Sequence, residues 1–339
     1  MLIQSNYSLQ QFNTFHLDSF SEQFCAVQNE DDAVESLLYA RNKELFILGG
    51  GSNILLVGNV KGLTLHNQLK GIEKVKEDDN CVWVKASAGE NWHTFVLHCI
   101  ENNWAGVENL SLIPGTVGAG PMQNIGAYGV ELKDVFYSLE AIHTQTLEKR
   151  TFTHADCQFD YRSSVFKTSE KGNYLITSVT FQLNKKPVFH TSYGAIEQEL
   201  EKMKVNELSI RAISNAVIQI RQSKLPDPAQ IGNAGSFFKN PLISVDHYKS
   251  LQFLFPNIPS YPVNETNVKV PAGWLIEQAG WKGKTIGEYG VHIYQALVLV
   301  NYGKAKGKDI LQLSNQIIED ISLKFNIQLE REVNVIGQS

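Results

Sequence analysis

Two glycine-rich segments have the residue types and spacing best suited to binding a phosphorylated ligand. Gly49-Gly50-Gly51-Ser52-Asn53 follows a short apolar run, and a longer segment extends from Ile113 to Gly129. Glycine lets backbone N–H groups approach a diphosphate closely, and successive N–H groups form an anion-binding nest. The sequence therefore predicts two phosphate-binding loops in the first half of the chain.

Neither loop matches the common nucleotide-binding fingerprints. Gly49–Gly51 lacks the third glycine of the dinucleotide-binding pattern, and after Gly118-Ala119-Gly120 that position is Gln123. Gly283-Lys284-Thr285 resembles the end of a P-loop, but Gln278 stands where the upstream glycine is required. These patterns exclude both a Rossmann site and a P-loop.

The second loop also carries polar side chains among its glycines. Thr116, Gln123 and Asn124 can hydrogen-bond the polar edge of a ring while the backbone holds phosphate. The nine histidines and four cysteines show no metal-ligand spacing, and no Gly-x-Ser-x-Gly elbow is present. We therefore expect an organic ligand and no catalytic metal.

Regular elements must position these loops. Apolar periodicity predicts a strand ending at the first loop and a helix shortly before the second. In the first half we expect strands at 45–48, 63–66, 81–86, 139–143 and 174–183, and a helix at 90–103. In the second half we expect a helix capped by Ser209, a strand at 296–300, a helix at 308–325 and a terminal strand at 328–336. The chain is therefore a mixed α+β protein, with its best boundary in the polar stretch 184–187.

Composition excludes several classes of protein. The 339 residues carry a net charge of −5, which does not provide the basic face that nucleic-acid binding requires. The N-terminal residues lack the pattern of a secretory signal, and no apolar run is long enough to span a membrane. Scattered cysteines are typical of a reducing compartment, so we expect a cytoplasmic protein with no membrane or nucleic-acid partner.

Both loops resemble those of one flavoenzyme family. Gly49-Gly50-Gly51-Ser52-Asn53 is similar to the first diphosphate loop of the vanillyl-alcohol-oxidase-type FAD-binding fold. Residues 113–129, IPGTVGAGPMQNIGAYG, resemble the second flavin loop of the enolpyruvoylglucosamine reductases nearly residue for residue, departing only at Gly120, where that family has alanine. Asn13-Thr14-Phe15 is similar to the opening of the same family.

The resemblance implies a fold and a cofactor. We expect an FAD-binding region at 1–186, with subdomains at about 1–70 and 71–186, a substrate-binding α+β domain at 187–326, and a C-terminal strand at 327–339 that returns to the active site. Neither loop contains the His or Cys that binds flavin covalently in relatives, so FAD is expected to bind non-covalently. The implied FAD contacts are Asn13, Thr14, Gly49, Gly50, Gly51, Ser52, Asn53, Pro114, Gly115, Thr116, Gly118, Ala119, Gln123, Asn124, Gly126, Ala127, Tyr128, Gly129 and Arg162.

Arg162 and Ser236 carry the family's first two catalytic roles by resemblance. Arg162 lies in a Tyr-Arg motif, and its guanidinium is expected to clamp and polarise a substrate carboxylate. Ser236 lies in Gly235-Ser236-Phe237-Phe238 and is implied to protonate an enolate-like intermediate. Serine is a weak acid, but such an intermediate is basic enough to take its proton.

Glu332 aligns with the third catalytic residue of the family. A carboxyl group with a raised pKa can share a proton with an enolic oxygen. Arg331 stands where the family has proline, and this cation could pair with either neighbouring glutamate. Glu330 therefore remains the alternative to Glu332.

Five further residues are implied to hold the substrate. Tyr193 resembles the mobile-loop tyrosine of the longer subclass of the family, and Arg221 and Lys224 resemble a cationic pair near the sugar nucleotide. Asn240 and Gln295 correspond to polar contacts with the diphosphate or uridine.

The resemblance implies a ping-pong reductase. NADPH reduces FAD and departs, and the flavin N5 then delivers hydride to UDP-N-acetylglucosamine enolpyruvate, forming UDP-N-acetylmuramate for peptidoglycan synthesis. We expect a monomer. The alternatives are an FAD oxidase or dehydrogenase with another small substrate, and a flavin sensor without turnover; neither needs a carboxylate clamp together with a proton donor.

Overall fold

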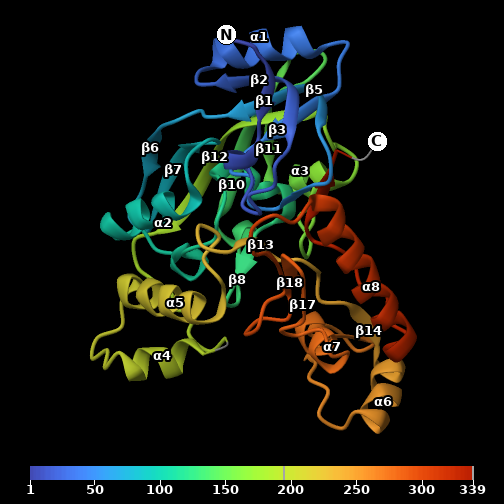
Figure 1. The fold of residues 1–339 in the computed structure, drawn as a ribbon. Coiled ribbons are helices and arrows are strands. Elements are labelled where there is room, and N and C mark those ends of the chain that lie inside the picture. Colours follow the sequence, from blue (N-terminus) through green and yellow to red (C-terminus); the bar gives the residue numbers. More distant parts are fainter. Residues whose placement is uncertain (194, 338–339) are drawn as a thin grey trace. The chain divides into compact units, whose positions relative to one another are not determined.

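The computed structural model describes residues 1–193 and 195–337, which form two compact units (Figure 1). Unit 1 consists of Met1–Tyr7, Ser21–Gly51 and Val60–Ser223. Unit 2 consists of Ser8–Phe20, Ser52–Asn59 and Lys224–Ser339. Two short early segments therefore belong to the same unit as the C-terminal third of the chain.

Unit 1 begins with a four-stranded sheet in the order β1-β2-β5-β3, in which β2 and β3 both run parallel to β5. Its strands are β1 (Gln4–Ser8), β2 (Phe20–Val27), β3 (Leu45–Leu48) and β5 (Val60–Asn67). Helix α1 (Glu30–Ala40), capped by Asn29, buries Ala33 and Leu37 in the core that contains Leu63 and Leu65 of β5. The predicted strands at 45–48 and 63–66 are confirmed.

A five-stranded antiparallel sheet forms the next part of unit 1, in the order β11-β10-β12-β7-β6. Its strands are β6 (Ile72–Glu77), β7 (Cys81–Ser87), β10 (Phe136–His143), β11 (Lys149–Thr153) and β12 (Tyr174–Asn184). Helix α2 (Trp92–Glu101) packs on the sheet through Phe95, whose ring lies 4.7 Å from that of Phe181. The strands predicted at 81–86, 139–143 and 174–183 and the helix at 90–103 are present.

Unit 1 also includes two helices that lie beyond the polar stretch 184–187. Helix α4 (Ile196–Lys202) packs against α5 (Ile210–Lys224), which Ser209 caps through the Ala212 N–H. The Ser214 hydroxyl in α5 lies 2.8 Å from that of Ser111. Contacts of this kind hold α5 on unit 1, so the compact unit ends at Ser223 rather than near residue 187. The short helix α3 (His154–Cys157) completes this unit.

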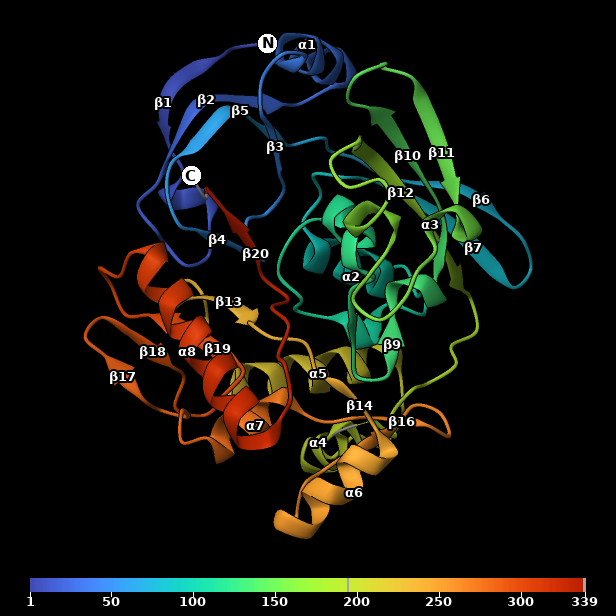
Figure 2. The ribbon, with the colours of Figure 1, turned by 90° about the vertical axis from the view of Figure 1, so that its right-hand side faces the viewer.

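Unit 2 contains a four-stranded sheet in the order β13-β19-β18-β17 and a three-stranded sheet in the order β14-β16-β15 (Figure 2). Their strands are β13 (Gly232–Ser236), β14 (Leu242–Ser244), β15 (Tyr261–Pro262), β16 (Asn267–Lys269), β17 (Thr285–Ile286), β18 (Tyr289–Val291) and β19 (Val298–Asn301). The helices are α6 (Val245–Leu254), α7 (Ala272–Gln278) and α8 (Gly307–Phe325). The amphipathic helix predicted at 308–325 is confirmed as α8, which buries Ile310, Leu313, Ile317, Ile321 and Phe325.

The terminal strand is shorter than predicted. Only β20 (Asn334–Ile336) is a strand, paired in parallel with β4 (Ile54–Leu56), whereas the sequence predicts 328–336. Before β20 the chain lies beside Phe237–Lys239, with backbone bonds at Glu330 and Glu332. The change of partner near Val333 interrupts the strand.

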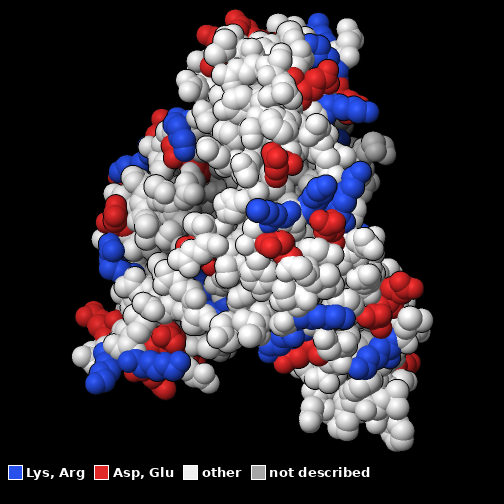
Figure 3. All heavy atoms as spheres, viewed as in Figure 1, with Lys and Arg blue, Asp and Glu red and all other residues white. Residues whose placement is uncertain are grey.

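Charged side chains of both signs occur on one face of the molecule. On the face shown in Figure 3, Lys and Arg side chains are interspersed with Asp and Glu side chains. In residues 1–193 and 195–337, no helix is long and apolar enough to cross a membrane, and no group of His, Cys, Asp and Glu is placed to hold a metal ion.

Candidate functional site: two glycine loops and three predicted catalytic positions

The two glycine-rich loops lie against each other in unit 1. A Cβ at Gly49 would lie 2.8 Å from the Thr116 hydroxyl oxygen, and one at Gly50 would lie 2.9 Å from the Cα of Gly115. Such distances leave no room for a side chain, so both backbones are brought together where only glycine fits. Two loops that expose backbone at one place fit the diphosphate of FAD.

The second loop is anchored to the segment before α2. The N–H groups of Val117 and Gly118 donate to the carbonyls of Glu90 and Ala88, each at 2.9 Å, and the Trp92 N–H donates to Gly115 at 3.1 Å. Pro114 precedes these contacts. Two 3₁₀ turns follow, η3 (Val117–Ala119) and η4 (Pro121–Gln123).

Three amides predicted to contact FAD hydrogen-bond the protein's own backbone. The buried Asn13 side chain donates to the carbonyls of Leu9 and Leu17 and accepts from the Leu17 N–H. The carbonyl of the neighbouring Thr14 accepts from the Asn233 N–H. Asn124 donates to Glu131 and Asp160 and accepts from the Lys133 N–H. Asn53, beside Ser52 in unit 2, donates to the Glu332 carbonyl at 3.2 Å. These bonds give all three amides structural roles.

The end of the second loop forms a hairpin that the sequence does not predict. Strands β8 (Gly126–Ala127) and β9 (Val130–Glu131) pair around Tyr128 and Gly129, which have φ of +50° and +81°. Two successive positive φ values are typical of a tight hairpin turn. A Cβ at Gly129 would lie 3.2 Å from the Cβ of Tyr193, so this predicted substrate residue lies at the end of the predicted flavin loop.

Arg162 occupies a strained position next to this hairpin. Asp160 and Ser163 exchange backbone hydrogen bonds, which leaves Tyr161 and Arg162 at the tip of a two-residue turn, with Arg162 at φ +51°. Its guanidinium donates to the Gly126 carbonyl at 2.7 Å. Strained backbone in a residue with a reactive side chain commonly marks a functional position.

Arg221 is a second cation in the same region of unit 1. It projects from α5, and its Nε donates to the Leu112 carbonyl at 3.2 Å. Burial lowers the pKa of Arg221, and Arg162 lowers it further, while Tyr128 raises it. Burial also raises the pKa of the Tyr128 hydroxyl. Lys224, three residues along α5, is exposed.

Ser236 ends β13 at an irregularity in the sheet. The register against β19 shifts between Asn233 and Ser236, and Gly235 has φ +68° with its N–H bonded to the Asn233 side chain. Phe237 and Phe238 are buried beyond it. Ser236 itself is exposed at the end of this firmly held segment.

The backbone of Glu332 lies beside that segment. Its N–H donates to the Phe237 carbonyl at 2.9 Å, and its side chain is half-buried. Glu330 instead pairs with Lys239 and is 71% exposed. Arg331 hydrogen-bonds Ser314 and Asn315 of α8. Glu330 therefore pairs with a cation at the surface, and Glu332 is the less exposed of the two carboxylates.

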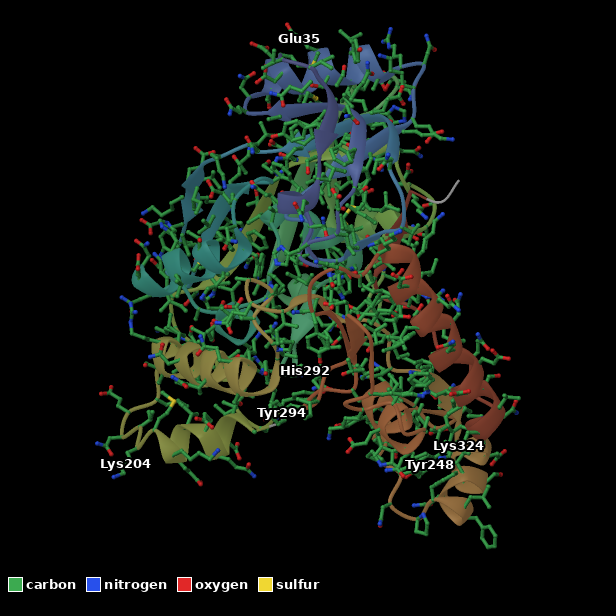
Figure 4. The ribbon with its side chains drawn as sticks, in the orientation of Figure 1. Glu35, Lys204, Tyr248, His292, Tyr294 and Lys324 are labelled. Carbon is green, nitrogen blue, oxygen red and sulfur yellow. The ribbon has the colours of Figure 1, made fainter. Side chains whose placement is uncertain are left out.

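Asn240 and Gln295 meet at the start of α7. The Asn240 side chain accepts from the Ala272 N–H at 2.9 Å, and the Gln295 side-chain oxygen would lie 3.4 Å from a Cβ at Gly273. Gln295 belongs to the turn between β18 and β19 that also carries His292 and Tyr294, whose rings lie 5.7 Å apart (Figure 4). His292 is buried, and its Nδ1 has no hydrogen-bond partner in the described part of the chain. His292 was not among the predicted site residues.

The sequence analysis also missed a cavity of about 450 Å³ beside the glycine loops. Gln28, His66, Gln68 and Lys70 are among the residues that line it. Gln28 directly follows β2, and Gln68 directly follows β5. Because β2 was not predicted from the sequence, the carboxyl ends of these two strands could not be recognised as neighbours.

Comparison with known proteins identifies the family. Residues 21–145 match a model described as an FAD binding domain, and residues 227–336 match the C-terminal domain of UDP-N-acetylenolpyruvoylglucosamine reductase. Reductases of that name from Flavobacterium johnsoniae and Amoebophilus asiaticus are 52% and 50% identical, each alignment covering 99% of this chain and 100% of the relative. The chain belongs to the UDP-N-acetylenolpyruvoylglucosamine reductase family.

The fold agrees with this assignment. A crystal structure of UDP-N-acetylenolpyruvylglucosamine reductase from Thermus caldophilus superposes with a TM-score of 0.68, covering 99% of this chain and 98% of its own at 20% identity. The predictions of an FAD-binding α+β fold with a C-terminal α+β domain, and of an FAD-dependent oxidoreductase, are confirmed.

Proposed function

We propose that this family member uses NADPH and FAD to reduce UDP-N-acetylglucosamine enolpyruvate to UDP-N-acetylmuramate, a precursor of peptidoglycan. The similarity over the full chain length supports the reaction class. The observation that carries the assignment of roles is the backbone bond between Glu332 and Phe237, because it puts a carboxyl-bearing residue beside the segment of the exposed Ser236.

FAD, when bound, supplies the hydride that the terminal carbon of the enolpyruvyl group accepts. Negative charge then builds on the neighbouring carbon and spreads into the substrate carboxylate. We assign Arg162 to hold that carboxylate, since its guanidinium remains charged and can form two parallel hydrogen bonds. The bond to the Gly126 carbonyl orients the guanidinium before substrate binds.

Ser236 then donates its hydroxyl proton to the carbon that carries the charge. The serine oxygen regains a proton from water, to which its exposed position gives access. Glu332 shares a proton with the enolic oxygen and so lowers the charge that Ser236 must neutralise. Tyr193, Arg221, Lys224, Asn240 and Gln295 are assigned to the sugar nucleotide.

NADPH and the enolpyruvyl substrate are proposed to use the same face of the flavin in turn. This order accounts for the absence of a separate nicotinamide fingerprint in the sequence. We further propose that the protein acts in the cytoplasm as a monomer and serves cell-wall synthesis, and so cell shape and division.

Ser236→Ala tests the assigned roles by separating the two half-reactions in stopped flow. NADPH-driven bleaching of the flavin should be unchanged, while its reoxidation by the enolpyruvyl substrate should slow by about 100- to 10,000-fold, the usual range for a lost general acid. Ser250→Ala, which removes an exposed hydroxyl from α6, is the matched control. Equal slowing of both half-reactions would refute the role of Ser236, and a purified protein that stays colourless and rejects added FAD would refute the function.

A further inference from the structure

Leu112, two positions before Pro114 of the second glycine loop, has an unfavourable backbone conformation. Its φ is +58°, in the left-handed region where a residue with a Cβ is disfavoured. Such a conformation persists only where the surrounding contacts hold it. The contacts of Leu112 therefore decide how the chain enters the loop.

Both polar backbone groups of Leu112 are bonded to side chains. Its N–H donates to Nδ1 of His93 at 3.0 Å, and its carbonyl accepts from Nε of Arg221 at 3.2 Å. His93 lies in the first turn of α2, and Arg221 lies in α5. The strained residue is therefore held between two helices of unit 1, with one side chain on each of its backbone groups.

The same two helices hold the residues on either side of Leu112. The Trp92 indole N–H donates to the Leu110 carbonyl at 2.9 Å, and the Trp92 backbone N–H donates to Gly115 at 3.1 Å. The Ser111 hydroxyl lies 2.8 Å from that of Ser214 in α5. Because these bonds fix the segment at both ends, loss of the His93 bond should disturb Leu112 locally and leave the fold in place.

The bond to Leu112 specifies the protonation state of His93. A backbone N–H only donates, so Nδ1 must be the acceptor nitrogen of a neutral ring whose proton is on Nε2. Burial lowers the pKa of His93, and the positive charge of Arg221 lowers it further. A proton on Nδ1 would turn this acceptor into a donor that faces the Leu112 N–H.

The acidic residues on the two segments that His93 joins have partners of their own. The Glu90 carboxylate accepts from the Gly71 N–H at 2.7 Å, and the Glu108 carboxylate accepts from the Gly106 N–H at 2.6 Å. The charge that acts on the His93 ring is instead that of Arg221. A protonated His93 would therefore add a second positive charge beside this guanidinium.

The Leu112 carbonyl links His93 to the cations of the candidate site. It accepts from Arg221, whose pKa is lowered by Arg162 and raised by Tyr128. These effects show that the Arg221 guanidinium lies close enough to both residues to interact with them. A change in the conformation of Leu112 would move the acceptor that orients Arg221.

We propose that His93 is a positioning residue, which in its neutral form holds Leu112 in its strained conformation and so directs Arg221 toward the sugar nucleotide. The proposal rests on the proposed function, in which Arg221 binds that substrate. It gives His93 no contact with the reacting atoms.

His93→Leu and His93→Asn test the proposal as a pair in steady-state kinetics. Leucine removes the acceptor, so the KM for the enolpyruvyl substrate should rise about 10-fold, as for a backbone donor left without its partner, with kcat changed less than about twofold. Asparagine carries an acceptor oxygen on the same γ carbon and should keep KM within about twofold of the unaltered protein. His98→Leu, which replaces another histidine of α2, is the matched control and should leave KM unchanged.

The pH profile distinguishes positioning by a neutral ring from simple packing. Because the pKa of His93 is lowered from 6.5, the ring is neutral at pH 8 and gains its proton only as the pH falls below 6.5. The KM of the unaltered protein should therefore rise several-fold between about pH 8 and about pH 5. His93→Asn cannot take this proton, so the ratio of the two KM values should increase as the pH falls. Titration of the substrate is common to both proteins and cancels in that ratio.

Two results would overturn the role of His93: equal KM increases in the leucine and asparagine variants, or a KM ratio that does not change with pH. Heteronuclear NMR of the imidazole in the unaltered full chain covers the case in which a variant does not fold. It should show the Nε2–H tautomer at pH 7.5, and a proton on Nδ1 at that pH would equally refute the proposal. Absence of turnover in the unaltered protein would instead refute the proposed function itself.

Discussion

At the scale of the single residue, Arg162 combines backbone strain with a directed side chain. Its φ of +51° is unfavourable for a residue with a Cβ, and the bond to Gly126 fixes where its guanidinium points. Lysine keeps the charge but cannot form two parallel bonds to a carboxylate. We therefore predict that Arg162→Lys slows flavin reoxidation by the enolpyruvyl substrate by roughly 10- to 100-fold, the loss of one charge-assisted hydrogen bond.

The same stopped-flow measurement supplies the control for Arg162. Arg150→Lys changes an exposed arginine paired with Asp156 in the same unit and should leave reoxidation unchanged. Flavin reduction by NADPH should be normal in both variants, because NADPH lacks the substrate carboxylate. Slowed reduction in Arg162→Lys would show that the residue acts on the flavin rather than on the substrate.

The cysteines provide a prediction about pH. Burial raises the pKa of the Cys157 thiol to about 12, so at pH 8 far less thiolate is present than in the unfolded chain, where the pKa is 9.0. Cys25 and Cys99 are also buried with raised pKa values, whereas Cys81 is half-exposed. Iodoacetamide at pH 8 should label Cys81 alone in the native protein and all four cysteines after denaturation. Mass spectrometry reads the sites, and native labelling of Cys157 would contradict its burial.

Residue types alone could not separate ligand contacts from structural ones. Asn124 was predicted to contact FAD because its amide suits a polar ring edge, and Asn13 and Asn53 were implied by the family resemblance. In the structure the same donors and acceptors satisfy backbone groups of nearby loops. The glycines were easier to interpret, since a Cβ at Gly50 has no space whatever the ligand.

At the scale of the element, the β8–β9 hairpin connects the flavin loop to Tyr193. Gly129→Ala would place a Cβ at φ +81° and 3.2 Å from the Tyr193 Cβ. We predict a loss of about 1–2 kcal/mol in unfolding free energy from the backbone strain. We also predict a raised KM for the sugar nucleotide, because Tyr193 must move.

Gly172→Ala separates these two effects. Gly172 has φ +79°, but a Cβ there would meet nothing within 4 Å. Denaturant unfolding should therefore show a similar loss of stability with no change in KM. An unchanged KM in Gly129→Ala would remove Tyr193 from the substrate site.

Elements with strong local patterns were predicted well. The apolar run 45–48 coincides with β3, and the 3.6-residue periodicity of 308–325 gave α8 to within one residue. The terminal strand was predicted too long because alternation within 328–336 does not reveal that the chain changes partner at Val333. The hairpin at 126–131 was missed because each of its strands has two residues, too few to show a pattern.

At the scale of the whole molecule, the chain order hides the composition of unit 2. Its sheet lies against an early segment: the Asn301 side chain donates to the Phe15 carbonyl at 2.8 Å, and the Asn233 N–H donates to Thr14 at 2.9 Å. Strand β4 pairs with β20 although some 280 residues separate Ile54 from Asn334. No local pattern encodes such pairings, so the sequence analysis placed residues 8–20 and 52–59 with the N-terminal region.

This interleaving predicts that the C-terminal part of the chain does not fold alone. A fragment 224–339 lacks the fully buried Phe15, which packs on Phe237 with ring centroids 6.3 Å apart, and it lacks the β4 partner of β20. Loss of a buried phenylalanine alone removes about 3–5 kcal/mol, a large share of the stability of a small domain.

Thermal unfolding followed by circular dichroism should show no cooperative transition for this fragment. Joining residues 8–59 to its start through a flexible linker should restore one, since both missing segments then return. A cooperative transition in the bare fragment, near that of the intact protein, would show that residues 8–20 and 52–59 lie on unit 2 without holding it together.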